Sequence, residues 1–555
     1  MWIISRVARL PRALSVAVSS SRLRQFRQNE AGTLVIFALM LTVLMMMMGG
    51  IAVDVMRYES RRTSLQNTLD RSTLAAASLS QAMNPRLVVD DYFLKAGLKE
   101  YLTSVTVTTG LNFRNVRATA SADTNPMFLH MMGINTFDAD GISNAEQRIN
   151  NVEIVLALDI SGSMSGSKIT NLRAAASSFV DTVLAGDAQQ KISIAIVPYN
   201  AQVNLPAVLL PEFNVTQSNG VTNDSCLDLP SSVYLTSGIP ATTALPMMAY
   251  ADTTSSTSKV NSFVALSSNL LNTSAAYCQK GTMNQLFLPN QTAAALKAKI
   301  NALQAGGNTS IMYGMRWALQ LLDPSAQTIF THLIASSAIP ATLAGRPVAY
   351  SDRQTLKVIV LMTDGENTQH ELITPAYKTG LSPIYKSAGD GYYSIRHITG
   401  RPAIAGANEY WVPHLSAWQA TPWDSGLGST QMDWKAIWPA MRSSYVEWQF
   451  YARALGTTTT AQNSIYNSTQ AAIEVMYGSV ATMDTQLQLA CSQAKTNGVV
   501  VYGIAFEAPI LGQTQIRNCS TDGANGSHYF SATGLQIATA FNAIANNISQ
   551  LRLTQ

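Results

Sequence analysis

The sequence predicts an α/β domain with a doubly wound, mostly parallel sheet, preceded by a transmembrane helix and a small β-containing subdomain. Short apolar runs rich in β-branched residues are typical of strands buried on both faces, and they occur at 152–158, 191–200, 356–364 and 499–506. Stretches with helical periodicity separate these runs, and such alternation favours a parallel sheet. An uncharged stretch near the amino terminus indicates the membrane helix.

That uncharged stretch, residues 31–53, spans about 34 Å as a helix at 1.5 Å per residue, enough to cross a bilayer. Residues 1–30 form a basic tail, with six arginines before the first acidic residue, Glu30. This asymmetry favours a cytoplasmic tail and places the long carboxyl-terminal part across the membrane. A cleaved secretory signal peptide is the alternative. Asp54 and Arg57 follow within a continuing helical pattern, which favours an uncleaved anchor.

Residues 54–149 read as a helical stalk followed by a membrane-proximal subdomain of alternating, β-prone residues. The segments FRQNEAGTLVIFALML (26–41) and GIAVDVMRYESRRTSLQNTLDRSTLAAA (50–77) resemble the amino-terminal region of TadG-like proteins of the bacterial Tad (Flp) pilus assembly system. Relatives processed as pilins carry a glutamate at the start of the apolar segment, whereas residues 33–41 are uncharged here. This departure also favours an uncleaved anchor, with pilin-like processing as the alternative.

Oxygen-bearing side chains follow two of the predicted strands. Asp159, Ser161 and Ser163 leave the carboxyl end of the first strand at alternate positions, Thr309 opens a helix after a glycine turn, and Asp364 ends the strand LKVIVLMTD. Open α/β sheets usually bind ligands at this edge, and carboxylate and hydroxyl oxygens suit a hard divalent cation. Each part alone is explained by a helix cap or a turn, but the joint arrangement favours a metal site.

In this order the five residues resemble the metal-ion-dependent adhesion site (MIDAS) of von Willebrand factor type A domains. The resemblance implies the von Willebrand type A fold for residues 150–555 and a bound Mg²⁺, or another divalent cation such as Mn²⁺ or Ca²⁺. It also implies a protein partner with an acidic residue that completes the metal site.

The four cysteines form an even set without the spacing of a metal site, as expected for disulfides in an oxidising compartment. Three pairings are possible. We favour Cys226 with Cys278 and Cys491 with Cys519, because each pair closes a local insertion or loop. Four buried free thiols, which would fit a cytosolic chain, are the alternative.

Two long insertions, at about 201–290 and 366–480, interrupt the type A domain. The second begins just after Asp364 and holds six of the eight tryptophans. A recognition surface beside the metal site is one interpretation, since aromatic residues anchor interfaces. We favour the other, a small core within the insertion itself. The six residues are Trp411, Trp418, Trp423, Trp434, Trp438 and Trp448.

Catalytic motifs are missing from the sequence. It contains no P-loop, GxGxxG or HExxH, and the turn at 162–166 has Met164 where a nucleophile elbow needs serine. His370, the histidine nearest to the proposed cation in sequence, is expected to be a surface or capping residue rather than a base. The net charge of +4 over 555 residues gives no sign of a nucleic-acid surface. We therefore do not expect an enzyme.

The predicted protein is a single-pass component of the bacterial inner membrane with its carboxyl-terminal domain in the periplasm. Its predicted function is Tad/Flp pilus assembly, through Mg²⁺-dependent binding of envelope or pilus proteins. A general envelope adhesin, or a periplasmic scaffold in which the metal is only structural, is the alternative.

Overall fold

The structure is a computed structural model, in which the chain divides into two units that are described separately below. One unit comprises Met1–Thr109 with Arg114–Gln147, and the other comprises Gly110–Phe113 with Arg148–Gln555. The residues that the structure describes are 31–78, 81, 83–109, 113–148, 151–185, 187, 189–254, 277–352, 354–522 and 527–549.

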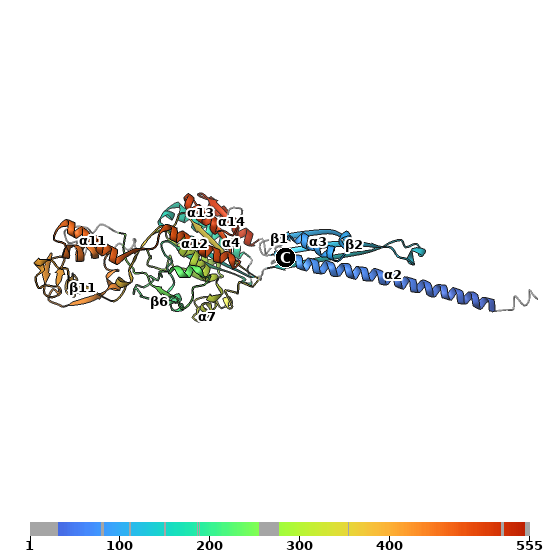
Figure 1. Ribbon diagram of the computed structural model, residues 1–555, viewed down its shortest axis with the longest axis horizontal. Coiled ribbons are helices and arrows are strands. Elements are labelled where there is room, and N and C mark those ends of the chain that lie inside the picture. The colour runs from blue at the N-terminus through green and yellow to red at the C-terminus, as the bar shows by residue number, and fades with distance from the viewer. Residues whose placement is uncertain are drawn as a thin grey trace, which may run out of the picture. The chain divides into compact units, whose positions relative to one another are not determined.

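The first unit is built on one long helix, α2 (Ala31–Ala77), which is the blue helix of Figure 1. Among the described residues it is the one helix long and apolar enough to cross a membrane, and its apolar side chains from Leu34 to Met48 are exposed. The predicted apolar helix is therefore confirmed.

The rest of the first unit packs on the second half of α2. Helix α3 (Pro85–Lys95) contributes Val89 and Phe93 to a core that includes Leu65 and Leu69 of α2. A three-stranded sheet completes this unit in the order β1-β2-β3, and β1 runs antiparallel to β2. Its strands are β1 (Leu102–Thr109), β2 (Phe113–Thr124) and β3 (Phe137–Arg148).

The second unit contains a six-stranded sheet in the order β18-β17-β9-β4-β5-β8. All neighbouring pairs are parallel except β5 with β8, which lies at the edge and runs antiparallel, so the sheet is mixed. The α/β character of this part is confirmed, with β8 coming from the segment assigned to the first insertion. The strands are β4 (Asn151–Asp159), β5 (Ile192–Tyr199), β8 (Phe287–Asn290), β9 (Thr355–Thr363), β17 (Val500–Phe506) and β18 (Tyr529–Ala532).

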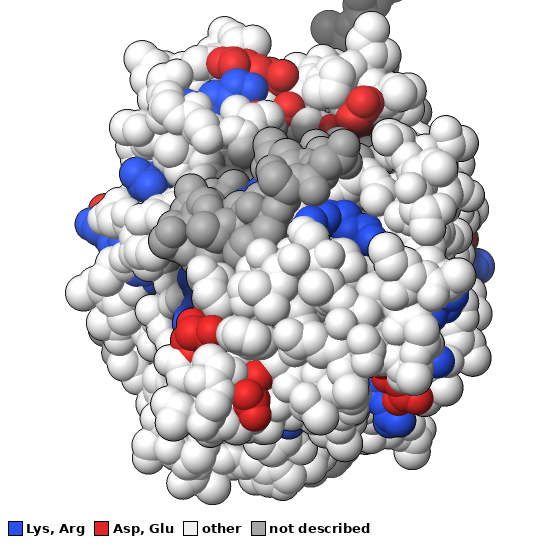
Figure 2. Space-filling model, turned by 90° about the vertical axis from the view of Figure 1, so that its left-hand side faces the viewer, with Lys and Arg blue, Asp and Glu red and all other residues white. Residues whose placement is uncertain are grey.

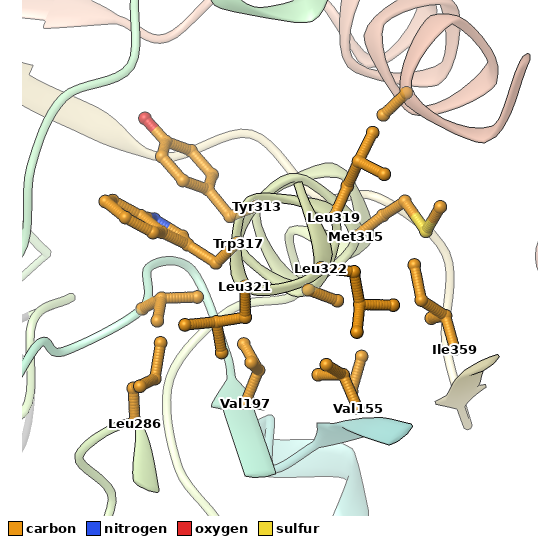
Figure 3. Close-up of a cluster of buried hydrophobic side chains, with 14 of the residues drawn as sticks. Val155, Val197, Leu286, Tyr313, Met315, Trp317, Leu319, Leu321, Leu322 and Ile359 are labelled. Atoms are coloured by element: carbon orange, nitrogen blue, oxygen red, sulfur yellow. The ribbon is translucent and has the colours of Figure 1, made fainter. Parts of the chain in front are cut away.

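Alternate residues of the central strands enter two hydrophobic cores, because side chains alternate between the two faces of a sheet. In the first core, Leu322 and Leu321 of α6 point toward Val155 and Val197 of the sheet, as Figure 3 shows. The second core contains Leu156 with residues of three other helices. Helices α6 (Ile311–Leu322), α12 (Val480–Thr496) and α13 (Ile510–Cys519) contribute to the first core, and α4 (Ser167–Leu184), α5 (Ala293–Ala302) and α14 (Gln536–Ser549) to the second.

A buried ion pair joins the two central strands. Glu153 and Lys357 are register partners on β4 and β9, and both side chains are about 5% exposed or less. Lys357 Nζ lies 2.6 Å from Glu153 Oε2 and donates to the carbonyl of Leu322 at the end of α6. The carbonyl end of a helix stabilises a cation. The carboxylate of Glu153 and the end of α6 therefore both offset the cost of burying the ammonium group.

The first insertion contains short elements between β5 and β8. Two-stranded parallel pairing joins β6 (Asn214–Thr216) and β7 (Ala244–Pro246). A disulfide between Cys226 and Cys278 closes this region, and a second between Cys491 and Cys519 joins α12 to α13. Both pairings favoured from the sequence are confirmed. After β8, helix α7 (Gln327–Ala335) lies between α6 and β9 in the chain.

The second insertion has its own sheet and its own core. The five-stranded sheet has the order β14-β13-β12-β11-β15, and β10 pairs with β16 where the insertion begins and ends. On the face shown in Figure 2, charged residues form small groups of both signs. The elements are β10 (Glu371–Ile373), β11 (Leu381–Ser387), β12 (Tyr393–Arg396), β13 (Tyr410–Val412), β14 (Ala417–Gln419), β15 (Ser429–Asp433), α8 (Trp434–Ile437), α9 (Ser443–Tyr445), a π-helix (Val446–Ala452), α10 (Arg453–Leu455), α11 (Thr459–Ile473) and β16 (Glu474–Met476).

The tryptophans of this insertion pack chiefly against one another and against neighbouring aromatic residues. Trp434 stacks on Trp438 with ring centroids 5.4 Å apart, and Trp411 lies 5.7 Å from Trp418. Trp434, Trp438, Trp411 and Trp448 are all buried. For these four residues the favoured interpretation, a core within the insertion, is confirmed.

Candidate metal centre

Asp159 ends β4, and a tight turn holds its carboxylate in place. The side chain is fully buried, Oδ1 accepts a hydrogen bond from the backbone N–H of Ser161 at 2.8 Å, and Oδ2 accepts one from Thr363 Oγ1 at 2.6 Å. The apolar strand carries the carboxylate to the edge of the sheet, and the short turn Gly162–Met164 then reverses the chain.

Asp364, immediately after β9, joins this turn through a chain of hydrogen bonds. Ser163 Oγ donates to Asp364 Oδ1 at 2.7 Å, and the hydroxyls of Ser161 and Ser163 lie 3.0 Å apart. Since β4 and β9 are parallel neighbours, their carboxyl ends meet at one edge of the sheet. Four of the five predicted ligands therefore lie together.

Thr309 reaches the same edge from the loop before α6. The backbone of Gly307, with a positive φ of 82°, accepts a hydrogen bond from Gly162 N at 2.9 Å, which joins this loop to the turn after β4. Thr309 N donates to Thr368 Oγ1 at 2.8 Å, and a Cβ atom added at Gly365 would lie 3.4 Å from Thr309 Oγ1. The hydroxyl of Thr309 thus lies beside the residue that follows Asp364.

The carboxylates of Asp159 and Asp364 are close enough to interact, and a lysine pairs with one of them. Burial, together with the nearby carboxylate of Asp364, raises the pKa of Asp159 to about 6. Lys168, at the start of α4, places Nζ 2.8 Å from Asp364 Oδ2 and 3.7 Å from Glu507 Oε2. Neither Lys168 nor Glu507 is marked in the sequence, because an isolated lysine or glutamate carries no local signal of an ion pair across the fold.

The side chains at this edge fit a hard divalent cation. All five predicted ligands offer oxygen, two of them as carboxylates, which is the donor set that Mg²⁺ and Ca²⁺ prefer. The described residues contain no group of three or more His, Cys, Asp or Glu that could hold a metal ion, so transition-metal sites rich in nitrogen or sulfur have no counterpart there. Any metal at this edge would depend on the hydroxyls as well as the carboxylates.

His370 is buried, so the expectation of a surface or capping residue is wrong. Its ring stacks on Tyr477, with centroids 5.3 Å apart, and its Nε2 lies 3.1 Å from Gln202 Nε2. Burial lowers the pKa of His370 to about 4. The imidazole is therefore held neutral and enclosed by side chains over most of the physiological pH range.

This burial predicts a pH dependence of stability. The unfolded chain binds a proton at His370 below its ordinary pKa of 6.5, whereas the folded chain does so only near pH 4. We expect this residue to remove up to about 3 kcal/mol of unfolding free energy as pH falls from 6.5 to 4. Urea unfolding of the full chain and of the His370→Gln variant between these pH values measures the difference. Parallel pH profiles for the two proteins would contradict the prediction.

Comparison with known proteins identifies one family over part of the chain. Residues 32–79 match the model of the Tad family, Flp pilus-assembly TadE/G-like. No curated protein sequence is significantly similar to this chain.

Several solved structures are similar to the chain at low identity. The vWF domain of the type V pili tip protein Mfa5 from Porphyromonas gingivalis is 14% identical, with a TM-score of 0.29 over 72% of this chain and 96% of its own. The adhesive tip pilin GBS104 from Group B Streptococcus agalactiae is 13% identical, with a TM-score of 0.30 over 72% and 100%. The pilus adhesin SpaC from Lactobacillus rhamnosus GG is 10% identical, with a TM-score of 0.29 over 80% and 33%.

Proposed function

We propose that this chain, whose residues 32–79 match the TadE/G-like family, is a membrane-anchored component of Tad/Flp pilus assembly that binds another protein through a divalent cation. The observation that carries the proposal is the chain of contacts from Asp159 through Ser161 and Ser163 to Asp364. These residues come from two strands about 200 positions apart, and they meet at the edge of the sheet where α/β domains bind ligands.

The residues that would hold Mg²⁺ are Asp159, Ser161, Ser163, Thr309 and Asp364. The two carboxylates offset the charge of the ion, and the hydroxyls supply neutral oxygens. When bound, the ion supplies a positive centre that an acidic side chain of a partner protein can complete. The chain itself positions the donors and performs no chemical reaction, so the proposal is a binding protein and not an enzyme.

The proposed location is the bacterial inner membrane, with α2 as a single-pass anchor and the second unit in the periplasm. Two observations support this orientation. Six arginines lie on the amino-terminal side of the apolar segment, and basic residues stay preferentially in the cytoplasm. The two disulfides in the second unit require an oxidising compartment, which the periplasm provides.

The experiment is capture of pilus assembly proteins from detergent-solubilised membranes by the tagged full chain. We expect Asp159→Ala to abolish capture while the protein remains in the membrane fraction after alkaline extraction. Asp181→Ala is the matched control, because Asp181 is an exposed aspartate paired with Lys297 on the surface. Capture by the Asp159→Ala variant at the level of the Asp181→Ala control would refute the role of the site.

A scaffold with a purely structural site is the second candidate. The ion pair of Lys168 with Asp364 favours it, because an ammonium group there balances one carboxylate without any metal. Chelation with EDTA during the capture experiment separates the two functions. The proposed function predicts that EDTA releases the partners, whereas a scaffold retains them.

A further inference from the structure

The turn between β2 and β3 is fastened to α2 by one carboxylate. Asp54 accepts hydrogen bonds from three successive backbone N–H groups, those of Met127 at 2.9 Å, Phe128 at 2.7 Å and Leu129 at 2.9 Å. The aspartate is 2% exposed. Because a carboxylate with three charge-assisted donors is well satisfied, this contact holds the turn firmly against the helix.

The contact lies at the end of the apolar segment of α2. Gly50 permits it, since a Cβ atom there would come within 2.4 Å of the ring of Phe128. Residues 31–53 are uncharged, and Asp54 is the first charged residue after them. The turn therefore lies level with the place where a membrane-crossing α2 would leave the lipid, beside the helix in Figure 1.

This turn exposes large apolar side chains. Between Asp123 and Asp138 the sequence contains no Asp, Glu, Lys or Arg. The short helix Leu129–Met132 forms the centre of the turn, and only Leu129 of that helix is buried. The exposed fractions are 84% for Met131, 65% for Met127, 55% for Met132, 41% for Phe128 and 39% for Ile134.

We infer that this turn, residues 127–134, is a second membrane contact, which inserts its methionines and Phe128 into the lipid interface beside α2. The occupant is the lipid surface itself, because the turn is attached to the helix at the level of the interface and offers uncharged, flexible apolar side chains. Exposed apolar clusters of this kind are costly in water and are stabilised at the boundary of headgroups and acyl chains.

The inference rests on the part of the proposed function that makes α2 a membrane anchor, and not on the metal site. A helix alone leaves the first unit free to pivot about one point. A second contact beside the helix fixes the unit close to the bilayer. Backbone N–H groups without an acceptor are costly near lipid, and Asp54 accepts hydrogen bonds from those of Met127, Phe128 and Leu129, where the short helix begins.

The experiment uses the full chain in phosphatidylcholine and phosphatidylglycerol vesicles. A cysteine replaces Met131 and carries an environment-sensitive fluorophore, and lipids carry a nitroxide quencher either near the headgroup or near the bilayer centre. Leu94→Cys is the matched control, because Leu94 is 65% exposed on α3 of the same unit. Leu39→Cys, within the apolar segment, reports whether α2 itself enters the bilayer.

We expect the label at Met131 to lose most of its fluorescence to the shallow nitroxide and to be shielded from aqueous iodide. The label at Leu94 should be quenched by iodide and only weakly by either nitroxide. A label at Met131 as open to iodide as that at Leu94 would overturn the inference. Shielding from both iodide and nitroxide would also overturn it, because a second copy or a partner protein would then cover the turn. If the label at Leu39 escapes the deep nitroxide, the anchor fails, and both this inference and the membrane part of the proposed function fail with it.

The role of Asp54 is tested in the same assay. Asp54→Asn keeps the shape of the side chain and removes its charge, so we expect weaker quenching of the label at Met131 and unchanged quenching at Leu39. Undiminished quenching at Met131 in this variant would overturn the assignment of Asp54 as the residue that holds the turn at the membrane.

Discussion

Replacing Asp364 with alanine is expected to weaken Mg²⁺ binding by at least about 100-fold, because one of only two carboxylates at the site is lost. The same change removes the acceptor of Ser163 Oγ, which links the turn after β4 to the end of β9. Isothermal titration calorimetry of the detergent-solubilised full chain measures the affinity. Wild-type affinity in the Asp364→Ala variant would exclude this edge of the sheet as the metal site.

Replacing Lys168 is expected to raise the affinity for Mg²⁺ instead of lowering it. Its ammonium group lies 2.8 Å from Asp364 Oδ2 and competes with a cation for that carboxylate. Lys168→Met should tighten Mg²⁺ binding about tenfold or more, since it removes a positive charge that is paired with a proposed ligand and repels a second cation there. Lys297→Met, which removes an exposed lysine paired with Asp181, is the matched control and should leave the affinity unchanged. A weaker affinity in the Lys168→Met variant would show that the lysine supports the site instead of competing for it.

The other large effect concerns the stability of the fold. Lys357→Met should lower the free energy of unfolding by about 3–5 kcal/mol. The variant leaves the carboxylate of Glu153 buried, with a backbone N–H of Val348 at 3.2 Å and the charge of Arg346 nearby but without its paired ammonium group. Glu153→Leu should lower the free energy of unfolding by a similar amount, because it leaves the ammonium group of Lys357 buried without its carboxylate. Urea unfolding monitored by tryptophan fluorescence measures both.

The double variant Glu153→Leu with Lys357→Met decides whether the charges matter as a pair. We expect it to recover most of the stability lost in either single variant, because two apolar side chains in register on adjacent strands can pack without a desolvated charge. Additive losses in the double variant would mean that the two residues stabilise the fold independently. Lys297→Met again serves as the surface control.

Local signals accounted for much of the candidate site. Asp159 and Asp364 each follow a continuous apolar strand, and Thr309 follows a glycine turn, so each position is marked within about ten residues of sequence. Their convergence needed the additional inference of a mostly parallel sheet, in which strand ends meet at one edge. The disulfide pairs could be predicted for a similar reason, because each closes a segment that is short relative to the chain.

Other features had no such local signal. Lys168 lies in a polar helix start and reads as a solvated residue, yet it is paired with Asp364 on a different element. His370 looked like a surface residue in a polar stretch, but Tyr477, more than 100 positions later, stacks on its ring and buries it. The strand β8 was assigned to an insertion because four residues give too short an apolar run to identify a sheet edge.

The sequence by itself determined the apolar helix, the central strands of the α/β unit apart from β8, the favoured cysteine pairs and the positions of the five oxygen donors, since hydrophobic periodicity and turn residues act over short stretches. Only the tertiary structure decided that Glu153 faces Lys357, that Lys168 neutralises Asp364 and that Asp54 holds the turn at Phe128. The physical reason is that burial and charge compensation depend on strand register and on contacts between distant segments, neither of which leaves a mark on the neighbouring residues.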